Sequence, residues 1–220
     1  MYFYRIVFAN HAVRICWRRE CQKVGREQNG YQTGAVAHFA YEGKSGNFIG
    51  SKMSDIEKKS DIFFIADTHF GDERILRYEN RPFASVEEMD AQIVRNWNER
   101  VKDDDTVYLL GDVGNESFIK NLSGRKFLVK GNHDTQSNEH YRRVGFLEVY
   151  DMPVIFEGFW ILSHEPLYVC KNMPYANIFG HVHANPIYKD FSEQSFCVSV
   201  ERIGYVPVSF VEIKRKIAGK

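Results

Sequence analysis

The 220-residue sequence has few cysteines, no long apolar run and no net charge, and each absence narrows the class of protein it can be. The four cysteines, Cys16, Cys21, Cys170 and Cys197, form no Cys-x-x-Cys pair, so neither a zinc ribbon nor a redox centre is indicated. Because disulfides are rare in the cytosol, we expect reduced thiols in a cytoplasmic protein. No apolar stretch approaches the roughly 20 residues of a membrane-spanning helix, so we expect no membrane partner.

The composition is that of a globular chain, with 44% hydrophobic and 26% charged residues, and the length suffices for one compact domain. Lys and Arg balance Asp and Glu at 29 each, so the whole chain has no general attraction for nucleic acid. The charges are divided unevenly. Residues 1–52 hold eight Lys or Arg against three Glu, a net of +5, which leaves 21 against 26, or −5, for residues 53–220. That negative balance argues against extended nucleic-acid binding.

Residues 1–52 differ in kind from the rest of the chain. They show no sustained period of 2 or 3.6, and Gly43 to Asn47 is a polar stretch typical of a loop. Such a basic segment is compatible with a transit peptide, a flexible arm for an anionic partner, or upstream sequence before a true start at Met53. We favour the last, because the first clear strand begins soon after Met53. We therefore predict a basic extension over residues 1–52 that lies outside the folded domain, and a domain over residues 53–220.

Short apolar runs and one helix follow. The runs have the length and composition of buried strands: Ile62–Ala66, Thr106–Leu110, Lys126–Val129, Val154–Phe156, Trp160–Leu162 and Asn177–Phe179. The spacing predicts a helix from Ser85 to Val101, with Ser85 and Glu88 as a capping box and Met89, Ile93 and Trp97 on its buried face. Strands over Phe196–Arg202 and Pro207–Lys214, joined by a turn at Gly204-Tyr205, are expected to close an α/β domain with two packed sheets.

Polar motifs stand directly after these apolar runs. They are Asp67-Thr68-His69, Gly111-Asp112, Gly131-Asn132-His133-Asp134, Ser163-His164-Glu165 and Gly180-His181-Val182-His183. Five of the six histidines after Met53 fall in them, and strand ends are where open α/β folds place ligand groups. Residues i and i+2 on an extended backbone point to one side, so each Asp-x-His or His-x-His pair is expected to present two ligands together.

The ligand types indicate a class of metal. Imidazole, carboxylate and amide oxygen without thiolate suit Mn²⁺, Fe or Zn²⁺, with manganese favoured, rather than an all-oxygen calcium site. Seven ligands are too many for one tetrahedral ion. Two divalent ions roughly 3.5–4 Å apart, sharing a carboxylate, would use them all. The seven candidates are Asp67, His69, Asp112, Asn132, His164, His181 and His183.

The order of these motifs resembles that of the calcineurin-like metallophosphoesterase superfamily, and the resemblance spans residues 61–183. It implies a four-layer α/β/β/α sandwich of two mixed sheets, with the metal site at the strand ends. The segment Arg74 to Phe83 is similar to that of a branch of small bacterial and phage phosphoesterases. The activity implied is hydrolysis of a phosphodiester or phosphomonoester by in-line attack of a metal-bound hydroxide, on a small substrate of nucleotide type.

The same resemblance implies a role for each residue. Asp67, His69 and His183 would bind the first metal, and Asn132, His164 and His181 the second, with Asp112 bridging them. Asn132 and His133 are the catalytic residues that it implies, with His133 contacting the phosphate and protonating the leaving oxygen.

One departure from the family pattern bears on substrate. Phosphoprotein phosphatases of the superfamily extend Gly-Asp to Gly-Asp-x-x-Asp, and the last Asp orients the catalytic histidine. This sequence has Asn115 there, which weakens the case for a protein phosphatase and leaves Asp134 as a candidate partner for His133.

Two arginines, Arg74 and Arg77, follow the first motif and are candidates for contact with substrate phosphate, although solvated helix-surface arginines are the more ordinary interpretation. A second hypothesis for the whole chain is a scaffold that keeps the fold and binds protein partners without catalysis. Such relatives typically lose metal ligands, whereas every ligand position is filled here.

Overall fold

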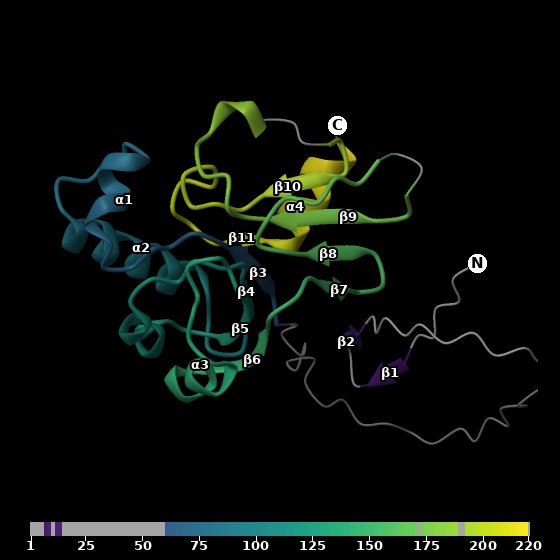
Figure 1. Cartoon of the computed structure of the whole chain (residues 1–220), viewed down its shortest axis with the longest axis horizontal. Helices are drawn as coiled ribbons and strands as arrows, with labels where there is room; N and C mark the ends of the chain where they lie inside the picture. The colour runs from purple at the N-terminus through teal and green to yellow at the C-terminus, as the bar shows by residue number, and fades with distance from the viewer. Residues whose placement is uncertain (1–6, 10–11, 15–59, 171–172, 189–191, 220) are drawn as a thin grey trace, which may run out of the picture. The chain divides into compact units, whose positions relative to one another are not determined.

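The computed structural model describes residues 7–9, 12–14, 60–170, 173–188 and 192–219, which form two mixed β-sheets with helices (Figure 1). The five-stranded sheet has the order β11-β3-β4-β5-β6, with bounds Val208–Ser209, Ile62–Ile65, Thr106–Leu109, Arg125–Val129 and Phe146–Tyr150. The six-stranded sheet has the order β1-β2-β7-β8-β9-β10, with bounds Val7–Ala9, Ala12–Arg14, Val154–Phe156, Trp160–Leu162, Ala176–Phe179 and Ser195–Cys197.

Both sheets combine parallel and antiparallel pairs. β3 to β6 are parallel and β11 is antiparallel to β3, while β8, β9 and β10 are parallel and the other pairs are antiparallel. The helices are α1 (Glu73–Tyr78), α2 (Val86–Arg100), η1 (Glu116–Asn121), α3 (Asn138–Val144), η2 (Pro186–Tyr188) and α4 (Phe210–Ala218). The predicted fold class, an α/β sandwich of two mixed sheets, is confirmed.

The core divides along the strand β3 because alternate side chains point to opposite faces of a sheet. Phe63 and Ile65 pack in one cluster with the buried face of α2, including Trp97. Phe64 and Ala66 pack in the other cluster, with residues of β8, β9 and α4. The five-stranded sheet is therefore covered by α2 on one face and by the second sheet and α4 on the other, which explains its continuous apolar strands.

The predicted helix agrees with α2, whose N-cap is Ser85 and whose C-cap is Val101. The Ser85 side chain accepts the N–H of Glu88 at 3.3 Å. The Glu88 carboxylate, however, accepts the N–H of Ala84 at 2.7 Å, so the capping box is closed one residue earlier than predicted. The six predicted core strands agree with β3, β4, β5, β7, β8 and β9 to within a residue at each end, whereas α3 and β6 carried no prediction.

The predicted C-terminal pair of strands is wrong. β10 and β11 lie in different sheets, so the turn at Gly204-Tyr205 passes from one sheet to the other rather than closing a hairpin. Most of the second predicted strand is helix α4. Two helix signals compete with its β-branched residues: Ser209 and Glu212 form a complete capping box, and Phe210 and Ile213 bury one helical face.

The two N-terminal strands pair with each other, and β2 lies beside β7 through Val13 and Ile155. The other residues of the segment 1–52 lie outside the described residues, and the proposal that this segment is not part of the folded domain stays a prediction. Within the described ranges, no helix is both long and apolar enough to cross a membrane.

Replacing Gly114 with Ala is expected to lower the free energy of unfolding by at least about 2 kcal/mol. Gly114 has a φ of +81°, and an added Cβ would lie 2.4 Å from the backbone nitrogen of Phe70, where the two loops leaving β3 and β4 pair. The matched control is Gly158→Ala, with a φ of +70° but nothing within 4 Å, which should cost about 1 kcal/mol from backbone strain alone. Chemical denaturation of the two variants checks this, and equal losses would contradict the importance of the close approach.

Candidate metal centre

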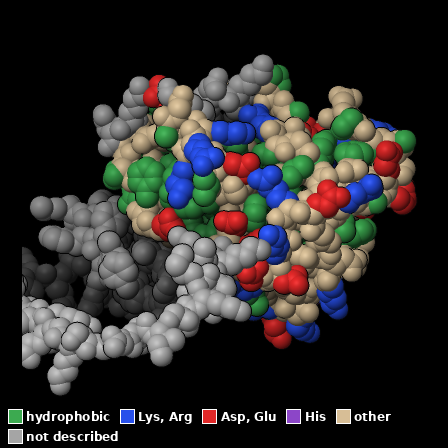
Figure 2. All heavy atoms as spheres, turned by 180° about the vertical axis from the view of Figure 1, so that it is seen from behind, with side chains coloured by type: hydrophobic (Ala, Val, Ile, Leu, Met, Phe, Trp, Pro, Cys, Tyr) green, Lys and Arg blue, Asp and Glu red, His purple; other side chains and the backbone are tan. Residues whose placement is uncertain are grey.

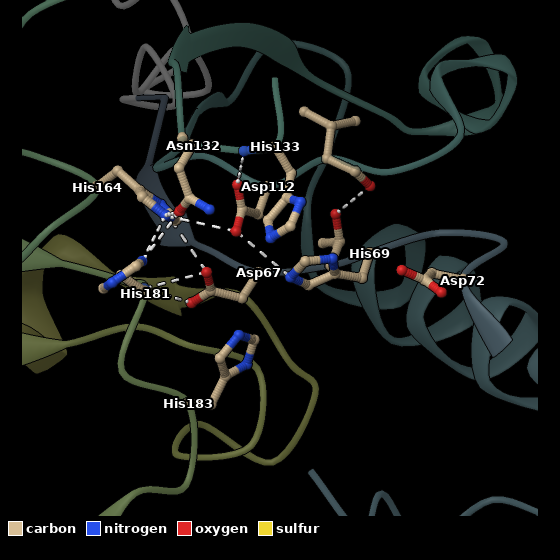
Figure 3. Close-up of polar contacts among 12 residues, drawn as sticks. Asp67, His69, Asp72, Asp112, Asn132, His133, His164, His181 and His183 are labelled. Atoms are coloured by element: carbon tan, nitrogen blue, oxygen red, sulfur yellow. Dashed lines mark hydrogen bonds and ion pairs between the residues drawn. The ribbon is translucent and has the colours of Figure 1, made fainter. Parts of the chain in front are cut away.

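The polar motifs of both sheets converge on one place, at the carboxyl ends of parallel strands (Figure 3). Asp67 follows β3, Asp112 follows β4, Asn132 follows β5, His164 follows β8 and His181 follows β9. Figure 3 shows the Asp112 carboxylate in the middle of the group, with His69 on one side and His164 and His181 on the other. The structure thus brings together all seven predicted ligands, from segments more than a hundred residues apart.

Sharp backbone kinks, rather than extended chain, present these side chains. The φ angles are 59° at Asp67, 47° at His69, 57° at Asp112, 69° at His181 and 45° at His183. We expected each Asp-x-His or His-x-His pair to present two ligands together because the backbone would be extended. That explanation is wrong, because the backbone at these residues is left-handed. Left-handed non-glycine residues cost about 1–3 kcal/mol each and persist only where their surroundings hold them, typically at functional sites.

Hydrogen bonds between the loops hold the kinks. The Asp67 N–H donates to the carbonyl of Gly111 at 3.0 Å, and the His69 N–H donates to the carbonyl of Asp112 at 3.0 Å. The His181 N–H donates to both carboxylate oxygens of Asp67, at 3.0 and 2.9 Å. The loops after β3, β4 and β9 are therefore one bonded unit, and strain in one is balanced by bonds to the others.

The ligand atoms form two neighbouring groups. Asp67, His69 and His183 offer atoms that all lie within 4.8 Å of one another, and so do Asp67, Asp112 and His164. The Asp112 Oδ2 lies 3.4 Å from Nε2 of both His69 and His164, between the two groups.

Asn132 and His181 lie beside His164, the histidine of the second group. The Asn132 Oδ1 lies 2.9 Å from His164 Nε2 and 3.1 Å from His181 Nδ1, and those two ring nitrogens are 3.1 Å apart. We refer to Asp67, His69 and His183 as the first half-site, and to Asn132, His164 and His181 as the second.

The residues fit divalent metal ions. His69 Nε2 is buried and has no hydrogen-bond partner, which is costly unless something binds it. The donors are imidazole nitrogens and oxygens without thiolate, as expected for Mn, Fe or Zn. Glycine leaves room for them, because a Cβ on Gly131 would lie 2.3 Å from Asp112 Oδ1 and one on Gly111 2.4 Å from His164 Nδ1.

Residues 60–207 match the model of the family described as calcineurin-like phosphoesterase. The chain belongs to this family. Calcineurin-like phosphoesterases are metal-dependent, and membership indicates a hydrolase acting on phosphate esters.

The relatives of this chain are small proteins. It is 35% identical over 162 residues to the uncharacterized protein MJ1445 of Methanocaldococcus jannaschii, covering 67% of this chain and 86% of that protein. It is 37% identical over 84 residues to the Gene 66 protein of Mycobacterium phage L5, covering 34% of this chain and 40% of the phage protein. A solved structure of the protein of unknown function AQ665 from Aquifex aeolicus is similar with a TM-score of 0.58 at 27% identity, covering 71% of this chain and 99% of that one.

Without a metal ion, the surroundings of this site favour the protonated forms of His164 and Asp67. Burial opposes a charge on His164, but its hydrogen bond to Asp112 and the nearby Asp67 and Asp112 carboxylates outweigh burial and raise the His164 pKa to about 9. Burial also works against ionised Asp112, yet the rings of His164 and His69, each 3.4 Å from its carboxylate, hold the Asp112 pKa well below the usual range. Burial raises the pKa of Asp67 despite the attraction of His183 and His164.

Metal binding is expected to release a proton and to strengthen as the pH rises. A cation needs the unprotonated His164 ring, whose pKa of about 9 means that the ring carries a proton at neutral pH. Below pH 9, apparent affinity should fall by up to about tenfold for each unit of pH. Calorimetric titration of Mn²⁺ at pH 6, 7 and 8, in buffers of different ionisation enthalpy, measures both effects. Equal apparent affinities at the three pH values, with no proton release, would contradict this.

His133 lies at the rim of the site and is exposed. Its ring centroid is 5.5 Å from that of His69, and its backbone N–H donates to Asp112 Oδ1 at 2.9 Å. Asp134, the predicted candidate partner, serves another purpose. Its buried carboxylate accepts the N–H groups of Asp112, Gly131 and Val113 at 2.8, 2.8 and 3.0 Å, so it holds the loops after β4 and β5 together.

Asn115 takes no part in orienting His133. Its side chain accepts the N–H of Ser117 at 3.1 Å and caps the short helix η1. Arg74 lies on α1, is exposed, and binds the carboxylate of Asp72 through Nε at 2.9 Å and Nη2 at 3.0 Å. Arg77 is exposed and lines a surface pocket with Arg74 and Tyr78. A substrate role for the two arginines stays a prediction.

Two residues beside the first half-site escaped the sequence analysis. Arg81 is buried, with 4% of its surface exposed, and its guanidinium donates to the backbone carbonyls of Asp67 and Thr68 at 2.7 and 3.1 Å. Glu201 accepts from Arg81 and lies 3.0 Å from Nδ1 of His183. Two signals in the sequence touch them: Glu201 and Arg202 are a charged pair at the end of the strand predicted over Phe196–Arg202, and Arg81 lies in the segment Arg74 to Phe83 that resembles the small bacterial and phage branch.

Proposed function

We propose that this chain is a dimetal-dependent phosphoesterase that hydrolyses phosphodiester or phosphomonoester bonds in a small substrate of nucleotide type. The observation that carries the proposal is the pair of ligand groups that meet at Asp67 and Asp112, within one network of buried hydrogen bonds. A protein that used this fold as a scaffold for partners would not need to keep strained backbone at five ligand positions.

The residues divide into a buried floor and an open rim. Asp67, Asp112 and His164 are buried, whereas Asn132 and His181 are exposed, so the second half-site can be reached from solvent. Two divalent ions, when bound, would supply Lewis-acid polarisation of the phosphoryl oxygens and activation of water. The floor residues hold the position of those charges, and the low exposure strengthens each electrostatic contact.

We assign His133 the role of general acid. It is the only histidine of the motifs that is outside both half-sites, and its exposed ring beside His69 can reach a phosphate bound over the rim. Asn132 precedes it on the same loop and belongs to the second half-site, so a candidate metal ligand and the general acid come from one turn. The backbone bond from His133 to Asp112 fixes that turn against the centre.

The charge balance favours a small substrate. Residues 53–220 hold 21 Lys or Arg against 26 Asp or Glu, a net of −5. Figure 2 shows both kinds of charge on a face on which no histidine is visible. Extended nucleic acid is bound by basic side chains that neutralise successive phosphates, which a negative net charge disfavours. The absence of an aspartate at Asn115 disfavours a protein phosphatase, since an amide does not stabilise an imidazolium as a carboxylate does.

Hydrolysis of bis-p-nitrophenyl phosphate and of p-nitrophenyl phosphate by the full chain tests the proposal. We expect turnover with added Mn²⁺ and none after chelation, with manganese as the best of Mn²⁺, Fe²⁺ and Zn²⁺. A metal-loaded protein that is no faster than the chelated protein on either ester would favour the scaffold hypothesis.

A further inference from the structure

The strongest unexplained feature is a buried charge network next to the first half-site, outside the predicted ligands. The Glu201 side chain is only 6% exposed, and its Oε1 lies 3.0 Å from Nδ1 of His183. A carboxylate only accepts hydrogen bonds, so Nδ1 is the donor in this pair. A neutral imidazole with its proton on Nδ1 has its lone pair on Nε2, the atom then available to a metal.

Arg81 holds this carboxylate from behind. Its Nη2 lies 2.7 Å and its Nε 2.9 Å from the same Glu201 Oε1. The same guanidinium donates to the carbonyls of Asp67 and Thr68, in the loop that carries two ligands of the first half-site. The buried guanidinium of Arg81 thus links the Glu201 carboxylate, which contacts His183, to the backbone of Asp67.

The loop that carries Glu201 also binds the backbone of His183. Arg202 donates through Nε to the carbonyl of His183 at 2.6 Å and through Nη2 to that of Asn185 at 2.7 Å. The loop is itself closed by a bond from the Tyr205 N–H to the Val200 carbonyl at 2.8 Å. His183 is therefore held at its ring and at its main chain by consecutive residues.

We propose that Glu201 is a positioning residue for the first metal ion, fixing the tautomer and direction of the His183 ring, with Arg81 fixing Glu201. The inference rests on the metal centre of the proposed function but not on the reaction. The side-chain bonds described for Arg81 and Glu201 join the two residues to each other, to His183 and to the backbone of Asp67 and Thr68, so their loss should affect the first ion and spare the second.

A competing arrangement is a direct ligand role. Glu79, His183 and Glu201 also offer atoms within 4.8 Å of one another, and Glu201 Oε2 is buried without a hydrogen-bond partner. The positioning role is favoured because Oε1 already carries the bonds from Arg81 and His183, and a guanidinium at 2.7 Å repels a further cation. Counting ions separates the two: positioning requires two ions in the wild-type protein, and a ligand cluster of its own requires three.

The test is Mn²⁺ binding by Glu201→Ala and Glu201→Gln, followed by calorimetry and by electron paramagnetic resonance without substrate. We expect Ala to weaken one of two sites by about 100-fold and Gln by about tenfold, because the amide oxygen still accepts from Nδ1. At limiting metal the variants should show the signal of an isolated ion in place of a coupled pair. Glu148→Gln, an exposed glutamate paired with Arg142, is the matched control and should bind as wild type.

Each other outcome overturns the proposal. The proposal is wrong if a folded Glu201→Gln binds both ions with unchanged affinity, or if both sites are weakened equally. It is also wrong if the wild type binds three ions and the variant two. If Ala leaves the Arg81 charge unpaired and prevents folding, the double variant Arg81→Met with Glu201→Gln removes both charges and is expected to lose the same single site. If the wild-type protein binds two ions but cleaves no ester, the proposed phosphoesterase activity is wrong, whereas the positioning role of Glu201 still stands.

Discussion

Asp112→Asn is expected to abolish metal-dependent ester hydrolysis while leaving the chain folded. Asp112 Oδ2 lies 3.4 Å from a ring nitrogen of each half-site, so under the proposed function its charge would serve both ions. If that charge contributes about 4 kcal/mol to transition-state stabilisation, its loss should lower kcat/KM by about 1,000-fold. The amide retains an oxygen that can accept the His133 N–H, as Oδ1 does now. Rates with bis-p-nitrophenyl phosphate and metal content after gel filtration measure the two effects.

Asp151→Asn is the matched control for this substitution. Asp151 is an exposed aspartate that pairs with Lys130 at 3.1 Å, and its loss should change neither metal content nor rate. If Asp112→Asn keeps both ions and at least half of the wild-type rate, Asp112 is not the bridging ligand.

His133→Ala is expected to separate chemistry from metal binding. The ring of His133 is exposed and belongs to neither ligand group, so the variant should hold the same number of ions as the wild type. Loss of a general acid typically lowers the rate by about 100- to 10,000-fold. The loss should be greatest for esters with poor leaving groups, because these need a proton most.

Comparing p-nitrophenyl and alkyl phosphodiesters in the wild type and in His133→Ala measures this dependence. His140→Ala is the control, since His140 lies on α3 beside Glu116, away from the ligand groups. A variant that lost an ion would make His133 a ligand, and an equal rate loss for good and poor leaving groups would remove the general-acid role.

Much of the fold was predictable because apolar strands and a capped amphipathic helix are local patterns. β3 and β4 are apolar along their length because both faces are covered, and α2 carries its own cap at Ser85. The prediction failed in the last segment, where a β-branched composition competed with the capping box of Ser209 and Glu212. The intrinsic preference of these residues for strand or helix is weak. The packing of Phe210 between the sheets, together with the capping box, favours a helix.

The sequence by itself determined the residue types of the candidate site: its motifs offer nitrogen and oxygen donors without thiolate, and the resemblance to the family divided these candidate ligands into two sets. Only the tertiary structure decided how those ligands are presented and what stands behind them. The left-handed kinks at Asp67 and Asp112 depend on hydrogen bonds between loops, and the Arg81–Glu201 pair joins residues 120 positions apart. A local pattern carries no information about a contact that forms only when two distant segments pack together, so no pattern around Arg81 indicated that it is buried at this site.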